Sequence, residues 1–433
     1  MDPVTIGVIG FVLLFILLAM RAPLGISMFL VGFGGIWILI SQGAAVAKIG
    51  LIPFETIADW DLAVLPLFLL MAHVIFSVGL SKDLYDVAAK WLGHTRGGIA
   101  IATVGGCAGF AAMSASSLAT AVTMGLVAIP EMKRLKYDPA LSTGCVAAGG
   151  TIGQLIPPSA GLITYGIITQ TSIGKLFAAG MIPGILEALF YMATIYILCT
   201  WKPSLGPPGP RYSFREKMSS LQSCYEIVLL VFFVLGGIIF GWFTATEAGA
   251  MGAFGAIGFS LIRGRLTWKN LKQAVIETLK TTGMLYGILI GAFLFKYFMA
   301  VTTIPFALAD FVGGLPFPPV VIMVFIMLVY VFLGCVMDAL AMILLTIPIF
   351  FPLALSLGFD AIWFGVILVR MTEIGLITPP IGMNVYAIAG IAKGVHVTTI
   401  FRGIVPFLIA DVFHVALLLF VPQVVLFLPN LIG

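Results

Sequence analysis

One motif with two adjacent prolines occurs twice in this chain and limits how the chain can fold. The copies are Thr151–Pro158 (TIGQLIPP) and Glu373–Pro380 (EIGLITPP), and each lies inside a long apolar run. Proline lacks an N–H donor and its ring clashes with the carbonyl four residues earlier, so each motif predicts a broken helix. The carbonyls expected to lose their partners are those of Gly153, Gln154, Gly375 and Leu376.

The composition places both motifs in a membrane. Hydrophobic residues make up 61% of the chain and charged residues only 9%, which excludes an ordinary soluble globule. Continuous apolar runs of about 18 or more residues recur along the chain and predict an all-α polytopic membrane protein surrounded by lipid. The five cysteines have no metal-ligand spacing, enzyme motifs are missing, and the net charge is only +4. We therefore expect no zinc site, no enzyme and no nucleic-acid partner.

The second half of the chain repeats the first. Ile374 follows Ile152 by 222 residues, and the same offset relates the other motifs of the two halves. This predicts an internal duplication with repeats over 1–201 and 222–433, joined by a cytoplasmic linker over 202–221. Each repeat holds an apolar run broken near its middle and then a broken helix, at 98–130 and 138–170 in the first repeat and at 318–354 and 361–393 in the second.

Basic residues orient the two repeats. With the N-terminus outside, 18 of the 22 Lys and Arg residues fall in cytoplasmic segments, as the positive-inside rule requires. This holds only if 98–130 and 318–354 are re-entrant helical hairpins that open on opposite sides of the membrane, with both chain termini outside. An inverted repeat with hairpins and broken helices is the architecture of a secondary transporter.

The hairpin tips and the helix breaks predict two sites. The first tip, Ser114–Thr120, is rich in hydroxyls, and together with carbonyls freed at the first break these oxygens suit Na⁺. The second tip supplies Asp338 opposite Glu373 and Thr378–Pro380. Half-helix N-termini at both places favour an anionic substrate. The alternative is close helix packing by small residues, but a serine cluster beside a repeated double-proline break favours a site.

Ionisable residues inside the apolar runs need a reason, because each costs about 2.5–3.5 kcal/mol on insertion. Arg370 has two interpretations, a bidentate contact with a substrate carboxylate or an ion pair with Glu373 three residues on. Lys296 lies near a helix end and is expected to snorkel to the membrane surface. We expect Asp411 and His414, three residues apart on the last helix, to pair with each other.

These motifs resemble the large membrane subunit of the tripartite ATP-independent periplasmic (TRAP) transporters, in the ion transporter superfamily. The likeness covers nearly the whole chain and rests on Ser114–Thr120, Gly153–Ser159, Leu333–Asp338, Phe359–Gly365 and Glu373–Gly382. It implies an elevator mechanism, Na⁺ coupling, a small four-helix membrane subunit and a soluble periplasmic substrate-binding protein. It also implies a bacterial inner-membrane protein with periplasmic termini that imports an organic acid, such as a C4-dicarboxylate, a sialic or other sugar acid, or a keto acid.

Carried over to this chain, the resemblance assigns residues to the ion and to the substrate. Na⁺ is expected at Ser114, Ser116, Ser117, Thr120, Gly153, Gln154 and Pro157, and at Gly334, Asp338, Gly375, Thr378 and Pro379. The substrate is expected at Ser116, Ser159, Arg370, Glu373 and Asn384. Arg370 stands where many relatives are expected to have a neutral residue, so it predicts a particular anionic substrate.

Other functions remain open at this point. The nearest alternative is a Na⁺- or H⁺-coupled symporter of the dicarboxylate or citrate type, from the same superfamily, that needs no binding protein. Uptake without a binding protein would favour it. An anion channel predicts fast, unsaturable conductance, and a membrane scaffold would not explain polar helix breaks in both halves.

Overall fold

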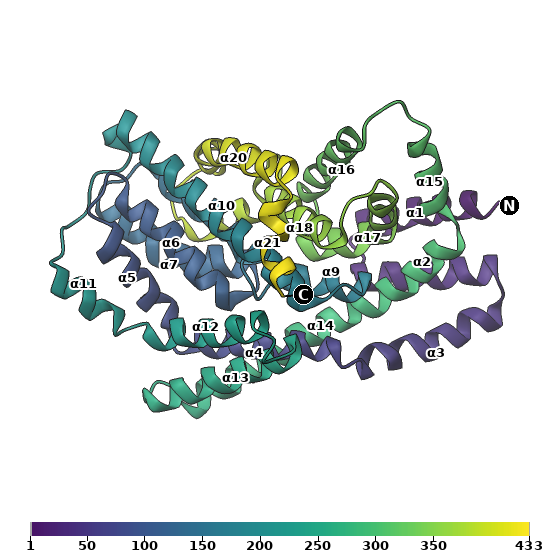
Figure 1. The fold of residues 1–433 in the computed structure, drawn as a ribbon, viewed down its shortest axis with the longest axis horizontal. Coiled ribbons are helices and arrows are strands. Elements are labelled where there is room, and N and C mark those ends of the chain that lie inside the picture. The colour runs from purple at the N-terminus through teal and green to yellow at the C-terminus, as the bar shows by residue number, and fades with distance from the viewer. Residues whose placement is uncertain (1, 433) are drawn as a thin grey trace.

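A computed structural model describes residues 2–432, which are helical throughout and include no β-strand (Figure 1). Membrane helices satisfy their backbone N–H and C=O groups internally, which is why such an apolar chain folds this way. In the first half the helices are α1 Pro3–Ala19, α2 Leu24–Leu39, α3 Gln42–Ala58, the 3₁₀ turn η1 Asp61–Ala63, α4 Val64–Ser77, α5 Leu80–Leu92, α6 Gly98–Ser114, α7 Ser117–Arg134, α8 Pro139–Leu155, α9 Ala160–Thr169, α10 Ile173–Trp201, the 3₁₀ turn η2 Pro203–Leu205 and α11 Phe214–Leu221.

The second half follows the same order. Its helices are α12 Tyr225–Ile239, α13 Ala245–Ile262, α14 Trp268–Val301, α15 Ile304–Gly313, α16 Pro319–Gly334, α17 Ala339–Ser356, α18 Ala361–Ile377, α19 Met383–Ile391, α20 Val397–Phe420 and α21 Gln423–Leu431. Helices α7 and α17 have 18 residues each, α8 and α18 have 17 each, and both pairs begin 222 residues apart. The assignment to two inverted repeats stays a prediction.

Three segments differ from the sequence prediction. Helix α3 was not predicted, α14 begins at Trp268 instead of near residue 283, and the predicted linker contains the helix α11. These helical turns carry Lys, Glu and Pro residues, so a search for uninterrupted apolar runs misses them. The offset pairs α3 and α4 with the single helix α14, but α3 and α4 are bent by 58° at their junction.

Several of these helices can cross a membrane. Over residues 2–432, five helices are long and apolar enough on their own: α10, α13, α14, α17 and α20. The number rises to seven if the bent pairs α3–α4 and α11–α12 each form one span.

The helices form two layers (Figure 1). In the first, α14 packs against α2, α3 and α4, and α13 packs against α4; we call α1–α4 and α12–α14 the scaffold. In the second, the two hairpins and the two broken helices pack against one another, and we call α6–α9 and α16–α19 the inner unit. The halves interlock there, because α7 contacts α19 and α17 contacts α9. Helices α10 and α20 pack against the inner unit from outside it.

Helices α6 and α7 form a hairpin whose two open ends meet. The backbone N–H of Ile99, at the start of α6, donates to the hydroxyl of Tyr137, just after α7, at 3.2 Å. The linker closes this mouth, since the N–H of Gly97 bonds the carbonyl of Gly206 at 2.9 Å and the N–H of Asp138 bonds that of Leu205 at 2.9 Å. Two packed helices that begin and end at one place run antiparallel, as predicted for 98–130.

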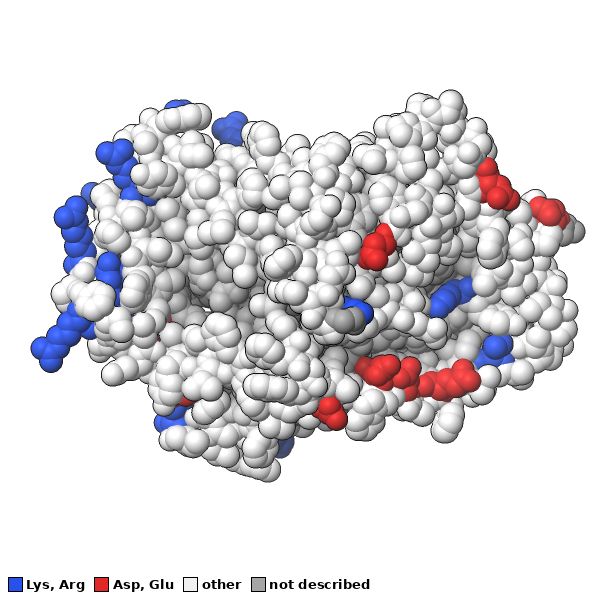
Figure 2. All heavy atoms as spheres, viewed as in Figure 1, with Lys and Arg blue, Asp and Glu red and all other residues white. Residues whose placement is uncertain are grey.

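Charged side chains separate along the long axis of the molecule. Figure 2 shows most of the visible Lys and Arg at the end where α5, α11 and the hairpin mouth lie, and most Asp and Glu toward the opposite end. This separation has the sense that the positive-inside rule requires if the long axis crosses the membrane.

Candidate functional site

The first hairpin tip lies directly against the end of α8. A Cβ added to Gly153 would lie 2.6 Å from the Thr120 hydroxyl and 2.9 Å from the Ser116 carbonyl oxygen. The N–H of Ala160, which begins α9, also bonds the carbonyl of Ala115 at 3.4 Å. The structure thus brings together the predicted tip and the predicted break, and only glycine permits the contact.

Hydroxyl and carbonyl oxygens concentrate at this tip. The hydroxyls of Ser114 and Thr120 are 2.6 Å apart, and the Thr120 hydroxyl donates to the Ser116 carbonyl at 2.8 Å. The Ser116 hydroxyl caps α7 by accepting from the Ala119 N–H at 3.4 Å. All these groups are hard oxygen donors, the kind that Na⁺ binds.

The break between α8 and α9 is more completely bonded than predicted. The Ser159 hydroxyl donates to the Gln154 carbonyl, and the Gln154 side-chain oxygen accepts from the Gly161 N–H at 3.4 Å. At the second break the Gly375 carbonyl accepts from the Thr378 N–H at 3.1 Å. The prediction that the carbonyls of Gln154 and Gly375 lack partners is therefore wrong, because nearby side chains and a turn replace the lost helical bonds. The Pro157–Pro158 and Pro379–Pro380 peptide bonds are both cis.

The second hairpin tip meets the end of α18 in the same way. A Cβ on Gly334 would lie 2.6 Å from the Cα of Gly375, and the Cys335 thiol donates to the Pro379 carbonyl at 3.2 Å. Asp338 caps α17 by accepting from the Leu340 N–H at 2.9 Å, and the Thr378 hydroxyl turns back to the Ile374 carbonyl at 2.7 Å. The carboxylate and hydroxyl of the second group thus each have a bond within their own helix.

The two breaks differ in exposure. Every residue from Thr151 to Ala160 is buried, including both prolines of the first break. At the second break Pro379 and Pro380 are exposed, as is Asp338 at the facing tip. In this conformation the second site is therefore the more accessible of the two.

Two buried polar side chains near the first tip lack partners. Glu373 on α18 and Asn384 on α19 are both fully buried, and none of their side-chain oxygen or nitrogen atoms has a hydrogen-bond partner among residues 2–432. Ser117 at the start of α7 faces the Glu373 carboxyl without meeting hydrogen-bond geometry. Unsatisfied polar groups are costly in a protein interior, so this pair marks a place that fits a cation or a polar ligand. Its oxygens, with those of the first tip, form a donor set that suits Na⁺.

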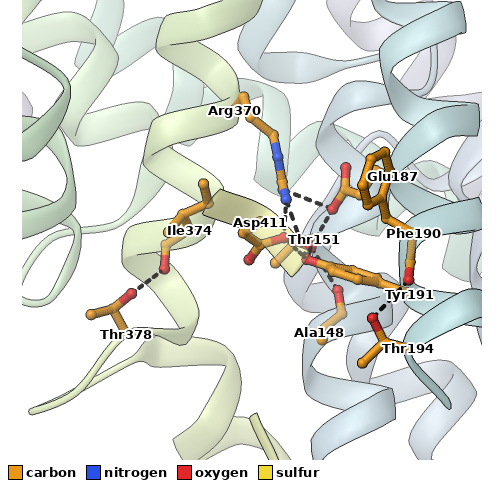
Figure 3. A network of polar contacts seen from close by, with 10 residues as sticks. All are labelled: Ala148, Thr151, Glu187, Phe190, Tyr191, Thr194, Arg370, Ile374, Thr378 and Asp411. Atoms are coloured by element: carbon orange, nitrogen blue, oxygen red, sulfur yellow. Dashed lines mark hydrogen bonds and ion pairs between the residues drawn. The ribbon is translucent and has the colours of Figure 1, made fainter. Parts of the chain in front are cut away.

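Arg370 lies in a different cluster (Figure 3). Its guanidinium is fully buried and donates to Glu187 on α10 at 2.7 Å and to Asp411 on α20. It does not pair with Glu373, so that interpretation is wrong. Both Nη groups already bind carboxylates of the chain, and a substrate would have to displace one of them.

Other predicted pairings also change. Asp411 accepts from Arg370 and from the Tyr191 hydroxyl, the latter at 2.7 Å, whereas neither ring nitrogen of His414 has a partner among residues 2–432. The expected Asp411–His414 pair is therefore wrong. Lys296 on α14 donates to the carbonyl of Ile168 on α9 at 2.7 Å, which links the scaffold to the inner unit.

Sequence reasoning missed Tyr191 and Thr151 as partners in this cluster. Thr151 lies 2.6 Å from Glu187, and Tyr191 lies 3.3 Å from an Arg370 nitrogen. The available signal was the rarity of charges in the apolar runs, which had drawn attention to Glu187, Arg370 and Asp411 separately. Their convergence from three helices depends on packing.

Two solved structures share this fold. The YdaH transporter of Alcanivorax borkumensis matches with a TM-score of 0.64 at 14% identity, over 88% of this chain and 89% of that one. MtrF of Neisseria gonorrhoeae, from a class of antimetabolite efflux pumps, matches with a TM-score of 0.63 at 16% identity, over 97% and 96%. At these identities the likeness concerns the fold alone, and the fold is that of a membrane transporter.

The sequence comparisons identify the family. Residues 11–424 match the family model of the DctM component of the tripartite ATP-independent periplasmic transporters. The chain is 37% identical to the C4-dicarboxylate TRAP transporter large permease protein DctM of Pseudomonas aeruginosa, over 92% of this chain and 93% of that protein. It is 32% identical to the sialic acid large permease SiaM of Vibrio cholerae, over 94% and 95%. It is 30% identical to the 2,3-diketo-L-gulonate large permease YiaN of Escherichia coli, over 85% and 86%.

The chain therefore belongs to the DctM family of TRAP transporter large permeases, which confirms the resemblance. It is an integral inner-membrane transporter subunit and not an enzyme.

Proposed function

We propose that this chain is the large permease of a Na⁺-coupled TRAP transporter that imports an organic acid anion. The observation that carries the coupling is the contact at the first tip, where the Ser116 carbonyl and the Thr120 hydroxyl lie against Gly153. The unpartnered Glu373 and Asn384 add oxygens close to that contact. A bound cation would supply the electrostatic partner that these buried groups lack.

A C4-dicarboxylate is the first substrate to test. The relative that is 37% identical is named for C4-dicarboxylates, and others at 30–32% are named for sialic acid and 2,3-diketo-L-gulonate. All three are organic acids, so the shared chemistry is a carboxylate. The exposed second tip and break offer it an entry point in this conformation.

The family implies two partners, a small four-helix membrane subunit and a soluble periplasmic protein that delivers the substrate. The scaffold offers apolar surface for the first, because large side chains on α1 and α3, among them Val12 and Phe54, are more than half exposed. Lipid covers whatever part of this surface the small subunit leaves free.

Transport by an elevator motion would move the inner unit against the scaffold. The Lys296–Ile168 bond crosses between these two layers, so this motion must break it. We expect a short bifunctional thiol reagent that joins Lys296→Cys to Ile168→Cys to stop uptake, with recovery on cleavage of the reagent. As a control, Phe11→Cys and Phe295→Cys lie within the scaffold, where the native rings are 6.0 Å apart, and joining them should leave uptake intact. Uptake that continues through the first cross-link would contradict the elevator motion.

The decisive test is uptake by proteoliposomes that contain the large and small subunits together with the binding protein. We expect accumulation of a C4-dicarboxylate that requires an inward Na⁺ gradient and the binding protein. Uptake without Na⁺ would reject the coupling. Uptake with full rate in the absence of the binding protein would favour the symporter of the dicarboxylate or citrate type.

A further inference from the structure

The cluster around Arg370 holds more negative than positive charge. It contains two carboxyl groups, Glu187 and Asp411, and a single guanidinium, and all three side chains are at most 1% exposed (Figure 3). If both carboxyls were ionised, the cluster would carry one uncompensated negative charge inside the protein. An unpaired buried charge costs several kcal/mol or more, and such groups neutralise instead.

Other charged groups do not correct this imbalance. The titratable groups that face Glu187 are Arg370 from α18, Asp411 from α20 and Tyr191 from α10. Glu373, one turn further along α18, adds another acid, and His414, one turn further along α20, lies next to the Arg370 cation. The remaining helices packed on α10 carry the titratable side chains Cys107, Cys145, Tyr165, Tyr225 and Glu226.

The hydrogen atoms around Thr151 show where a proton is missing. The Thr151 hydroxyl oxygen lies 2.6 Å from the Ala148 carbonyl and 2.6 Å from a Glu187 carboxyl oxygen. Both partners are acceptors when Glu187 is ionised, yet the threonine hydroxyl has one hydrogen to donate. The tyrosine nearby cannot supply the second hydrogen, because the Tyr191 hydroxyl donates to Asp411 at 2.7 Å.

The two carboxyls are not equally supplied with donors. Asp411 Oδ1 receives hydrogen bonds from Arg370 and from Tyr191, so it is the natural ionised partner of the guanidinium. Glu187 Oε1 receives one bond from Arg370 at 2.7 Å, and its second close contact is the contested Thr151 hydroxyl. A hydrogen on Glu187 that is donated to Thr151, with Thr151 donating to Ala148, uses every hydrogen once.

We propose that the Glu187–Arg370–Asp411 cluster is a proton-binding site, with the proton on Glu187 and Asp411 ionised. The site joins both broken helices, since Thr151 belongs to α8 and Arg370 to α18. Its single proton keeps the connection between the two halves electrically neutral. This inference does not depend on Na⁺ coupling.

Infrared spectroscopy of the purified full-length chain tests the proposal. A protonated carboxylic acid has a carbonyl stretch that is separate from the amide and carboxylate bands and shifts in D₂O. We expect this band at about pH 7, where an ordinary glutamate is ionised, and its loss in Glu187→Gln. We expect the same loss in Asp411→Asn, because the remaining Glu187–Arg370 pair is neutral without a proton. Glu247→Gln, at an exposed helix start on α13, should leave the band unchanged.

Glu373 is buried and can contribute an acid band of its own, so the comparison is made in a Glu373→Gln background. If both cluster variants retain the acid band of that background, both carboxyls are ionised and the proposal is wrong. If a variant does not fold, isotope labelling of the unsubstituted cluster decides the matter: ¹³C-carboxyl glutamate should shift the band and ¹³C-carboxyl aspartate should not. A shift with labelled aspartate would overturn the assignment to Glu187.

Discussion

Gly334 and Gly375 pack backbone against backbone, and a Cβ added to either would lie 2.6 Å from the Cα of the other. The contact joins the second hairpin tip to the end of α18. No side chain can move aside to make room, so this contact and that at Gly153 are where the inner unit is least tolerant of change.

The first prediction concerns this contact. Gly375→Ala should destabilise the protein by about 1–3 kcal/mol, as overpacking does, and raise the Na⁺ concentration for half-maximal uptake. Thermal unfolding in detergent and Na⁺-dependent uptake measure the two effects. Gly390→Ala is the matched control on α19, because a Cβ there meets no described atom within 4 Å. Equal behaviour of the two variants would contradict the close approach.

The second prediction concerns the first tip. Thr120→Val removes the hydroxyl that bonds Ser114 and the Ser116 carbonyl, at a cost of about 1–2 kcal/mol. If that hydroxyl helps to bind Na⁺, the half-saturating Na⁺ concentration should rise roughly 5- to 30-fold. Thr123→Val, also buried on α7, serves as the control and should leave Na⁺ dependence as it is. An unchanged Na⁺ response in Thr120→Val would remove this residue from the site.

The third prediction concerns Arg370. Arg370→Met leaves Glu187 and Asp411 buried without their cation, and removal of one partner of such a buried group costs about 3–5 kcal/mol. We expect little folded protein by size-exclusion chromatography in detergent. Arg134→Met removes an ion pair at an exposed position on α7 and should leave the folded yield unchanged. If Arg370→Met instead folds normally and only changes substrate preference, Arg370 acts on the substrate and not on the structure.

The fourth prediction concerns the mouth of the first hairpin. Tyr137→Phe leaves the buried N–H of Ile99 without its partner, which costs about 1–3 kcal/mol. The melting temperature should fall, and hydrogen exchange should increase at the start of α6. Tyr196→Phe, whose ring is 52% exposed, should change neither. Protection at Ile99 that survives the substitution would mean that the hairpin mouth is closed by the linker alone.

The fifth prediction concerns orientation in the membrane. All five native cysteines are buried in the described chain, so a membrane-impermeant maleimide should report introduced cysteines. We expect Ser213→Cys, in the exposed linker, to react only from the cytoplasmic side, and Asp61→Cys, exposed at the α3–α4 bend, only from outside. Labelling of both from one side would reject the predicted topology.

The sequence by itself determined the features that depend on neighbouring residues. Pro157 and Pro379 end α8 and α18 because proline cannot continue a helix, and Asp138 and Asp360 cap the starts of the same helices through backbone N–H bonds three or fewer residues away. The offset of 222 residues and the uneven basic charge can likewise be counted along the chain. These are short-range or compositional properties, so they need no knowledge of packing.

Tertiary structure alone decided which distant groups meet. Arg370 binds Glu187, 183 residues away, and Asp411, 41 residues away, rather than Glu373 on its own helix. Helices α10, α18 and α20 are apolar on nearly every side, and in a membrane such helices carry no polar face that indicates which side contacts protein. The direction of a buried charge is then set by packing between helices, which is why the helix breaks were predictable and the partners of Arg370 were not.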